Sequence, residues 1–139
     1  MEDFFRSSGR IIQTRMTVVR LSDQSLLLHS PGRLTRQLKG RLEVLGEVRH
    51  IISSYRIHHL FLQKIAFKLS PQAIFLSDYS AAYRQAKFYS TSPADLPRKE
   101  QNLHFHAILN DLPEAAWRED LDQAIFSGVG ALKEVVFFH

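Results

Sequence analysis

A helical stripe of leucines lies between two regions of β-forming residues, and this order limits the folds open to the chain. Residues 17–29 contain two short β-forming runs, and residues 48–52 contain a third that is rich in branched side chains. The stripe consists of Leu34, Leu38, Leu42 and Leu45. A helix that leads from one strand to another is typical of an α/β sheet, whose ligands bind at the carboxyl ends of the strands.

Turn and cap residues mark the ends of these elements. A short polar turn joins the two strands of a predicted β-hairpin, Thr17–Leu21 and Ser25–His29. Ser30 is the expected N-cap of the helix, with Pro31 in its first turn, and Gly46 occupies the place of a left-handed C-terminal cap. We therefore expect strand, strand, helix and strand, in that order, in the first part of the chain.

The later part of the chain continues to alternate between helical and strand patterns. Residues 72–76 are apolar and fit either element. Along Leu103–Leu109 the side chains alternate, with His104 and His106 on the face opposite Phe105. The expected helices cover residues 58–69 and 78–84, the second capped by Asp78, and the expected strands cover residues 86–89, 103–109, 121–126 and 134–138. These patterns predict an α/β (α+β) fold.

The size and composition of the chain are those of a single soluble domain. It has 139 residues, of which 45% are hydrophobic and 23% charged. The lack of cysteine excludes a disulfide framework, a thiolate zinc site and a cysteine nucleophile. No apolar run approaches the roughly 18 residues that span a bilayer, so we expect no membrane partner and a cytoplasmic location. We interpret residues 1–15 as a loose N-terminal extension and residues 16–139 as the domain.

The net charge of +4 is unevenly distributed along the chain. Between Arg33 and Lys68 eight basic residues stand against two acidic ones, whereas the stretch from Asp111 to Glu134 is mainly acidic. A basic stretch can bind nucleic acid or an acidic partner, and it can also be the solvated surface of a helix. No recognisable nucleic-acid-binding module accompanies it, so the solvated surface is the simpler interpretation.

Six short segments, taken together and in order, carry a resemblance to a known family. They are Met16-Thr-Val-Val-Arg-Leu-Ser-Asp, Leu27-Leu-His-Ser-Pro, Gly46-x-Val-Arg-His-Ile, His58-His-Leu-Phe-Leu, Trp117 with Leu121-Asp-Gln-Ala-Ile-Phe, and Glu134-Val-Val-Phe-Phe-His. The chain from Met16 to His139 resembles the DUF4336 proteins, an uncharacterised family that is similar to the metallo-β-lactamase (metallo-hydrolase/oxidoreductase) superfamily. The resemblance implies a degenerate branch of that superfamily, with a metallo-β-lactamase-like αββα architecture.

The resemblance also implies where a metal site would lie. In active members of the superfamily, the corresponding strand ends in a His-x-His-x-Asp-His motif, whose side chains bind zinc or iron ions that activate water. In one alignment the ligand positions hold Tyr55, Ile57, His59 and Leu60. In an alignment shifted by one residue, His58 and His59 take the last two positions. At most two ligands therefore survive, and the remaining positions are degenerate.

The same resemblance shows two further differences between this chain and the superfamily's sequence pattern. Residues 63–77 correspond to an insertion that precedes the segment beginning at Asp78. The superfamily's next histidine ligand would fall near residues 126–130, where the chain has no histidine, and the remaining ligands would lie beyond His139. We therefore expect a domain that is incomplete at its C-terminal end.

Two histidine pairs are the candidate metal ligands. Neighbouring residues on a helix point about 100° apart, so His58 and His59 can share one metal ion only with a ligand from elsewhere. The alternative is that one of them bonds the carbonyl end of the sheet while the other lies at the surface. His104 and His106 face the same way on a strand, a geometry that some metal sites use, although the polar face of an edge strand shows the same pattern.

Other signals of catalysis are weak. Glu119, Asp120 and Asp122 could pair as catalytic carboxylates, but their place in a polar turn favours surface charge. The chain has no glycine-rich phosphate-binding motif and no Gly-x-Ser-x-Gly nucleophile elbow. Nucleotide hydrolysis and serine hydrolysis therefore have no positive support.

These observations predict a metallo-β-lactamase-like domain with an eroded metal site, which binds or assembles rather than hydrolyses. No cofactor is expected in this form. One alternative is a metal-dependent hydrolase with a single zinc or iron ion at His58 and His59. A second alternative is binding of nucleic acid or an acidic partner through residues 33–68, and self-association remains open.

Overall fold

A mixed sheet of five strands forms the centre of the fold, described here from a computed structural model. The described residues are 2–7, 10–53, 71–91, 104–127 and 133–138. The five strands are β3 (Thr17–Arg20), β4 (Ser25–His29), β5 (Glu47–Ser53), β6 (Lys87–Ser90) and β7 (Phe105–Ile108). They lie in the order β3-β4-β5-β6-β7, with β3 antiparallel to β4 and all other neighbours parallel. The fold class is therefore mixed α/β.

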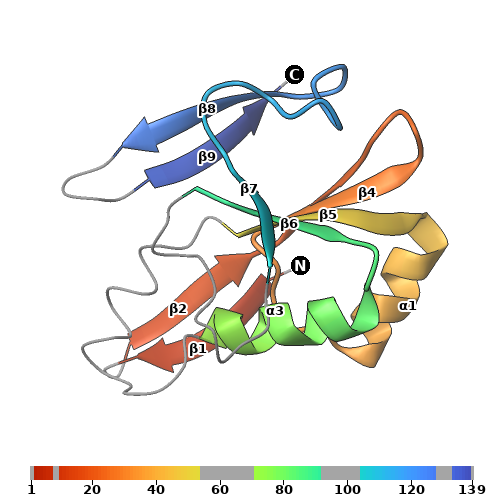
Figure 1. Ribbon diagram of the computed structural model, residues 1–139. Helices are drawn as coiled ribbons and strands as arrows, with labels where there is room; N and C mark the ends of the chain where they lie inside the picture. The colour runs from red at the N-terminus through yellow and green to blue at the C-terminus, as the bar shows by residue number, and fades with distance from the viewer. Residues whose placement is uncertain (1, 8–9, 54–70, 92–103, 128–132, 139) are drawn as a thin grey trace.

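The helices α1 (Arg36–Leu45) and α3 (Pro71–Ala82) cover one face of this sheet (Figure 1). Leu38 and Leu42 of α1 and Tyr79 of α3 are buried against the sheet. The sheet contributes Leu26, Leu28, Val48, Ile51, Phe88 and Phe105 to the same core. Burial of each leucine stabilises the fold by about 2 kcal/mol, so the leucine stripe holds α1 on the sheet.

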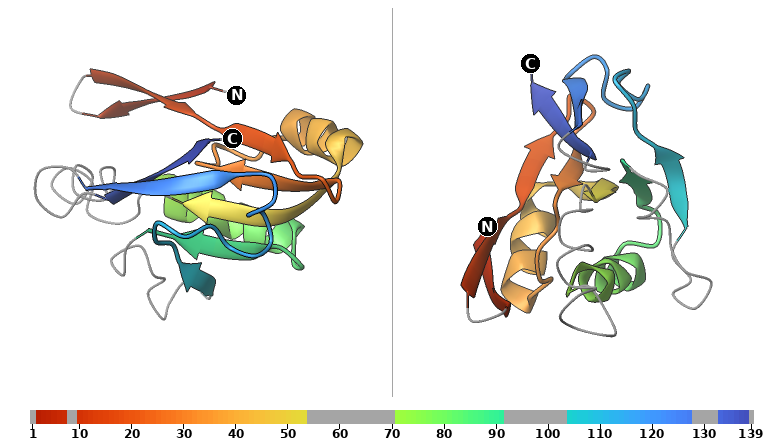
Figure 2. Two further views of the ribbon diagram at one scale, coloured as in Figure 1. Left: turned by 90° about the horizontal axis from the view of Figure 1, so that it is seen from above. Right: turned by 90° about the vertical axis from the view of Figure 1, so that its left-hand side faces the viewer.

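A second sheet covers the opposite face. It consists of the antiparallel strands β8 (Asp122–Ser127) and β9 (Lys133–Phe138). Figure 2 shows these two strands as a layer on the side of the five-stranded sheet away from the helices. The core on this side consists of Leu21, Leu27, Ile52, Tyr89, Leu109, Trp117, Leu121 and Val135. The described layers are therefore helices, five-stranded sheet and two-stranded sheet.

Residues 2–15 form a β-hairpin rather than the loose extension that the sequence led us to expect. β1 (Glu2–Ser7) pairs antiparallel with β2 (Arg10–Arg15), and the pair is separate from the five-stranded sheet. The apolar residues of this segment occur as adjacent pairs, Phe4-Phe5 and Ile11-Ile12. Because such pairs break the period-two alternation, the segment lacked the usual signal of a strand.

The strands that the sequence predicts after residue 16 are confirmed. The hairpin of β3 and β4 has its turn at residues 22–24, where Gln24 has a φ of 73°. β5, β6, β7, β8 and β9 all fall on segments where the sequence predicts strands. The helix expected at residues 58–69 lies outside the described residues, as does the part of the expected insertion before Pro71.

A bulge in β5 decides which of its side chains face the helices. Leu26 pairs with Val48 and Leu27 pairs with His50, so Arg49 is an extra residue opposite β4. The extra residue shifts the alternation by one position. As a result, Val48 packs in the core beneath the helices while His50 faces the other side of the sheet, against Trp117.

The N-cap of α1 is Thr35, so the expectation of Ser30 as the cap is wrong. Thr35 Oγ1 accepts a hydrogen bond from the backbone N–H of Leu38 at 3.1 Å. Ser30 has a φ of 60°, and its N–H donates to the carbonyl of Ile52 at 2.9 Å. Ser30 therefore joins the ends of two strands, and the helix begins only after this connection.

Gly46 ends α1, as the sequence predicts, but in a more extended conformation than a left-handed cap. Its N–H donates to the carbonyl of Leu42 at 3.0 Å, and its φ is 158°. A Cβ atom at this position would lie 2.5 Å from the carbonyl oxygen of Gln24. Only glycine fits here because the chain passes directly against the β3–β4 turn.

α3 begins at Pro71 and contains Asp78, so the expectation that Asp78 caps a helix at residues 78–84 is wrong. Proline is favoured in the first turn of a helix, where its missing N–H costs nothing. The ambiguous residues 72–76 belong to this helix. Leu76 and Tyr79 of α3 are buried, whereas Asp78 is exposed between them.

Candidate functional site

The carboxyl ends of three parallel strands form a buried polar edge of the sheet. β4 ends at His29, β5 at Ser53 and β6 at Ser90, which Thr91 follows. The three hydroxyl residues Ser53, Ser90 and Thr91 are 3%, 0% and 2% exposed. Ligands of α/β sheets bind at this edge, so it is the candidate functional site.

Backbone hydrogen bonds tie the strand ends together at this edge. The N–H of Ser30 donates to the carbonyl of Ile52 at 2.9 Å. The N–H of Leu109, directly after β7, donates to the carbonyl of Ser90 at 2.6 Å. The positions of the polar side chains are therefore set by the sheet itself rather than by a loose loop.

His29 adds an imidazole to the edge, which the sequence analysis did not single out as a site residue. Its ring lies 5.2 Å from the ring of Phe137 in β9, at an angle of 80°. Burial lowers the pKa of His29 to about 4. The imidazole is therefore neutral at physiological pH, and neutral imidazole is the form that binds a metal ion or accepts a proton.

The histidine pair predicted from the sequence follows the same edge along the chain. β5 ends at Ser53, five residues before His58. His58 and His59 lie outside the described residues, together with the degenerate motif positions Tyr55, Ile57 and Leu60.

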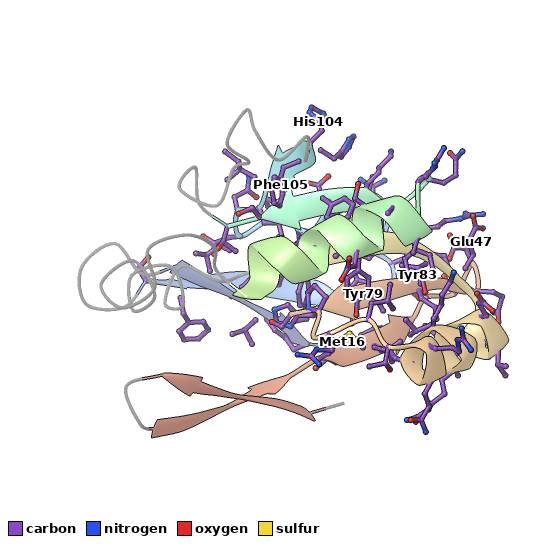
Figure 3. The ribbon with its side chains drawn as sticks, turned by 90° about the horizontal axis from the view of Figure 1, so that it is seen from below. Met16, Glu47, Tyr79, Tyr83, His104 and Phe105 are labelled. Atoms are coloured by element: carbon purple, nitrogen blue, oxygen red, sulfur yellow. The ribbon has the colours of Figure 1, made fainter. Side chains whose placement is uncertain are left out.

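The second histidine pair lies at the opposite end of the sheet. His104 directly precedes β7 and His106 is its second residue, so both are at the amino end of that strand. Both side chains are exposed, with His104 shown in Figure 3. Because β7 is parallel to β6, the structure does not bring this pair to the edge formed by Ser53 and Ser90.

The acidic residues near Trp117 make separate contacts at the surface. Asp120 Oδ2 accepts hydrogen bonds from the N–H and the hydroxyl of Ser22, at 3.2 and 3.0 Å. Glu119 lies 3.6 Å from the guanidinium of Arg118, and both side chains are exposed. Asp122 is exposed at the start of β8. The interpretation of these residues as surface charge agrees with the positions they take.

Within the described ranges, no three histidine, aspartate or glutamate side chains lie close enough to hold one metal ion. The candidate ligands His58 and His59 fall outside those ranges. Zinc or iron at this edge therefore remains a prediction from the resemblance.

A second polar cluster, the His50 cluster, lies between the five-stranded sheet and the β8–β9 layer. His50 Nδ1 lies 3.2 Å from the hydroxyl of Tyr89, and the two rings of His50 and Trp117 lie 5.5 Å apart at 73°. Tyr89 and Trp117 also meet edge to face, with centroids 4.9 Å apart. The cluster consists of His50, Tyr89, His106, Trp117 and Gln123.

Gln123 connects this cluster to the loop before β8. The Trp117 indole N–H donates to Gln123 Oε1 at 3.0 Å. The Gln123 amide donates in turn to the carbonyls of Asn110 and Leu112, at 2.6 and 3.1 Å. These bonds satisfy the buried polar atoms of Trp117 and Gln123, so the indole is held in a single orientation.

Burial changes the pKa values of both titratable groups at the centre of the cluster. It lowers the pKa of His50. The positive charges of Lys87 and Arg49 lower this pKa further, whereas the negative charge of Asp23 raises it. Burial also raises the pKa of Tyr89 to about 12, with a further contribution from Glu114. At neutral pH the cluster therefore contains a neutral imidazole and a neutral phenol.

The sequence contained a signal for this cluster. His50 directly precedes the apolar pair of β5, and Gln123 directly precedes the apolar run of β8. Buried polar side chains require hydrogen-bond partners, so each one indicates a contact with another element. The partners of His50 and Gln123 could not be named from the sequence because they depend on the Arg49 bulge and on the second sheet.

Three basic residues of the described part of this stretch lie on the solvent side of α1. Arg36, Lys39 and Arg41 are exposed there, beside the exposed Glu43. This placement is that of a solvated helix surface, which was the simpler of the two interpretations.

The structure is that of a mixed α/β domain with polar residues at the carboxyl ends of its parallel strands. No model of a known protein family matches the chain, and no curated protein matches it significantly. None of the helices in the described part of the chain has the length and hydropathy of a membrane-spanning segment.

Proposed function

We propose that the chain is a metallo-β-lactamase-like domain that binds a small polar ligand at the carboxyl edge of its parallel strands, without competent hydrolysis. The observation that carries this proposal is the uncharged polar edge, which consists of the buried Ser53, Ser90 and Thr91 and the half-buried His29. Hydroxyls and a neutral imidazole exchange hydrogen bonds with a ligand.

The layers of the fold support the architectural part of the proposal. An αββα sandwich has two sheets packed face to face with helices outside. Here α1 and α3 pack on the outer face of the five-stranded sheet, and the β8–β9 sheet packs on its inner face. Three of the four layers of such a sandwich thus have counterparts in the described residues.

The residues at the motif positions support the loss of hydrolysis. If the resemblance holds, Tyr55, Ile57 and Leu60 stand where the superfamily has metal ligands. Isoleucine and leucine have no atom that binds zinc or iron. A site with only one or two ligands would hold such an ion weakly and would not activate water efficiently.

Metal analysis and a hydrolysis assay test this proposal together. The protein is purified without a histidine tag, and its zinc, iron and manganese contents are measured. We expect contents far below one equivalent, and no hydrolysis of bis(p-nitrophenyl) phosphate or a chromogenic β-lactam after zinc or iron is added. Binding is followed by NMR with a library of small polar compounds, and we expect amide shifts at Ser30, Ser53 and Thr91.

One observation favours a second candidate, a hydrolase with a single zinc or iron ion. His29 ends β4 beside β5, the strand after which His58 and His59 follow, so three imidazoles belong to this part of the chain. Three histidines are a known ligand set for catalytic zinc. Near-stoichiometric metal that is lost in both His59→Ala and His29→Gln, but retained in His104→Gln, would replace the first proposal with this one.

A further inference from the structure

His50 occupies an unusual position, because it is a buried imidazole where the sheet meets the segment that carries Trp117. Its side chain is 7% exposed. Its ring contacts Tyr89 of β6 and Trp117, and Trp117 is held by Gln123 of β8. His50 thus connects the five-stranded sheet, through Trp117 and Gln123, to the β8–β9 layer.

The charged and titratable groups around His50 are mostly basic. Lys87 of β6, His106 of β7 and Arg49 of β5 all act against a positive charge on the imidazole. Asp23, in the β3–β4 turn, is the single group that favours it. Asp23 is exposed, and it accepts hydrogen bonds from the N–H and hydroxyl of Ser25 at 2.9 and 2.6 Å.

We propose that His50 is a pH-sensitive switch: when its imidazole gains a proton, the segment of Trp117 and the β8–β9 sheet loosen from the five-stranded sheet. A buried imidazolium needs water or a carboxylate partner, and Trp117 and Tyr89 offer neither. Water reaches the ring when the segment of Trp117 moves away. This inference holds whatever ligand the carboxyl edge binds.

The position of a second histidine, His29, agrees with a loosening that is confined to one side of the five-stranded sheet. His29, the other histidine with a lowered pKa, contacts Phe137 of β9, so it lies beneath the same layer. The core on the helix side contains no histidine among its described residues. Protonation therefore acts on the β8–β9 side and leaves the packing of α1 and α3 intact.

The pH window follows from the direction of the pKa change. Because the pKa of His50 in the folded protein is below the ordinary value of 6.5, the closed state is fully favoured above pH 6.5. The free-energy preference for the closed state is lost as the pH falls from 6.5 through the lowered pKa of His50.

Trp117 provides a direct readout, since it is the one tryptophan of the chain. We expect its fluorescence emission to shift to longer wavelength as the pH is lowered from 7.5 to 5, while the far-UV circular dichroism keeps at least nine-tenths of its signal. The substitution His50→Gln should abolish this shift, because glutamine fills similar space without a titrating group. The matched control His104→Gln, at an exposed histidine, should retain it.

NMR of the unsubstituted protein keeps the test decisive if His50→Gln does not fold. The imidazole signals of His50 should then titrate with the same midpoint as the Trp117 emission. An emission shift that persists in His50→Gln, or a His50 midpoint that differs from the fluorescence midpoint, would overturn the switch. A loss of circular dichroism with the same midpoint would also overturn it, because the whole domain would then be unfolding.

Discussion

Tyr83, directly after α3, carries a buried hydroxyl without a hydrogen-bond partner, which is a local defect in the packing. The hydroxyl is cut off from solvent, and burial raises the pKa of the phenol, with a further contribution from Glu43. Figure 3 shows Tyr83 beside Tyr79 on the side of the sheet that the helices cover. An unsatisfied buried hydroxyl costs about 1 to 3 kcal/mol relative to a solvated one.

The substitution Tyr83→Phe removes only the unsatisfied hydroxyl. It should therefore leave the free energy of unfolding unchanged or raise it by up to about 1 kcal/mol. Urea unfolding at pH 7 measures this change. Tyr79→Phe is the matched control: its hydroxyl lies 3.5 Å from the sulfur of Met16, and removing it should lower stability. A clear loss of stability in Tyr83→Phe would show that its hydroxyl has a partner in solution.

Alanine substitutions of two glycines, one in α1 and one at its C-terminal end, should change the stability of the protein in opposite directions. At Gly40, in the middle of the helix, an added Cβ would meet nothing within 4 Å. Glycine destabilises a helix interior by about 1 kcal/mol relative to alanine, so Gly40→Ala should raise the free energy of unfolding by that amount. Gly46→Ala should lower it, because the new Cβ would collide with the carbonyl of Gln24. Equal effects of the two substitutions in thermal unfolding would contradict this account.

At the scale of the elements, the Thr35 cap defines where α1 begins. Thr35→Ala removes the acceptor for the Leu38 N–H and should cost about 1 kcal/mol. Thr35→Ser keeps a hydroxyl in the same place and should cost much less. Chemical denaturation of both variants checks the prediction, and similar losses would mean that the methyl group rather than the hydrogen bond matters.

The sequence predicted most elements because their signals are local. The leucine stripe of α1 and the branched residues of β5 are patterns within about ten residues, and the structure confirms the helix and the strand. Only Leu38 and Leu42 of the stripe are buried on α1, because Leu34 precedes the helix and Leu45 is exposed. The Arg49 bulge was not predictable, because it depends on the pairing of β5 with β4 rather than on β5 itself. The cap at Ser30 was wrong for a related reason, because Ser30 bonds the carbonyl of Ile52 and the helix begins only after Thr35. The cap at Asp78 was wrong because the apolar residues 72–76, which fit either element, belong to the same helix.

The candidate site was predicted only in its location. The carboxyl end of the strand at residues 48–52 was expected to bind ligands, and the structure adds His29, Ser90 and Thr91 there. These residues come from strands distant in sequence, so their proximity depends on strand order. Likewise, His50 and Tyr89 are 39 positions apart, and their hydrogen bond has no sequence signal beyond the isolated histidine.

At the scale of the whole molecule, stability should depend on pH through two histidines. His29 has a pKa of about 4 in the folded protein against 6.5 when unfolded, so stability is fully present above pH 6.5 and falls as the pH decreases toward 4. For His29 alone the loss is about 3 kcal/mol. Urea unfolding at pH 7, 5.5 and 4.5 measures it, and His29→Gln should flatten the dependence. If the free energy of unfolding of His29→Gln depends on pH as that of the unsubstituted protein does, other groups cause the loss of stability.

The contact of Ser22 with Asp120 spans 98 positions, and the layer that it helps to hold follows all five strands of the central sheet along the chain. Leu27, Ile52 and Tyr89 face that layer, so their side of the sheet stays bare until residues 117–137 have left the ribosome. The helix side, by contrast, can close once Phe105 of β7 has been made. The growing chain therefore leaves one apolar sheet face uncovered until these residues are made, and at that stage chaperones would have the most to protect.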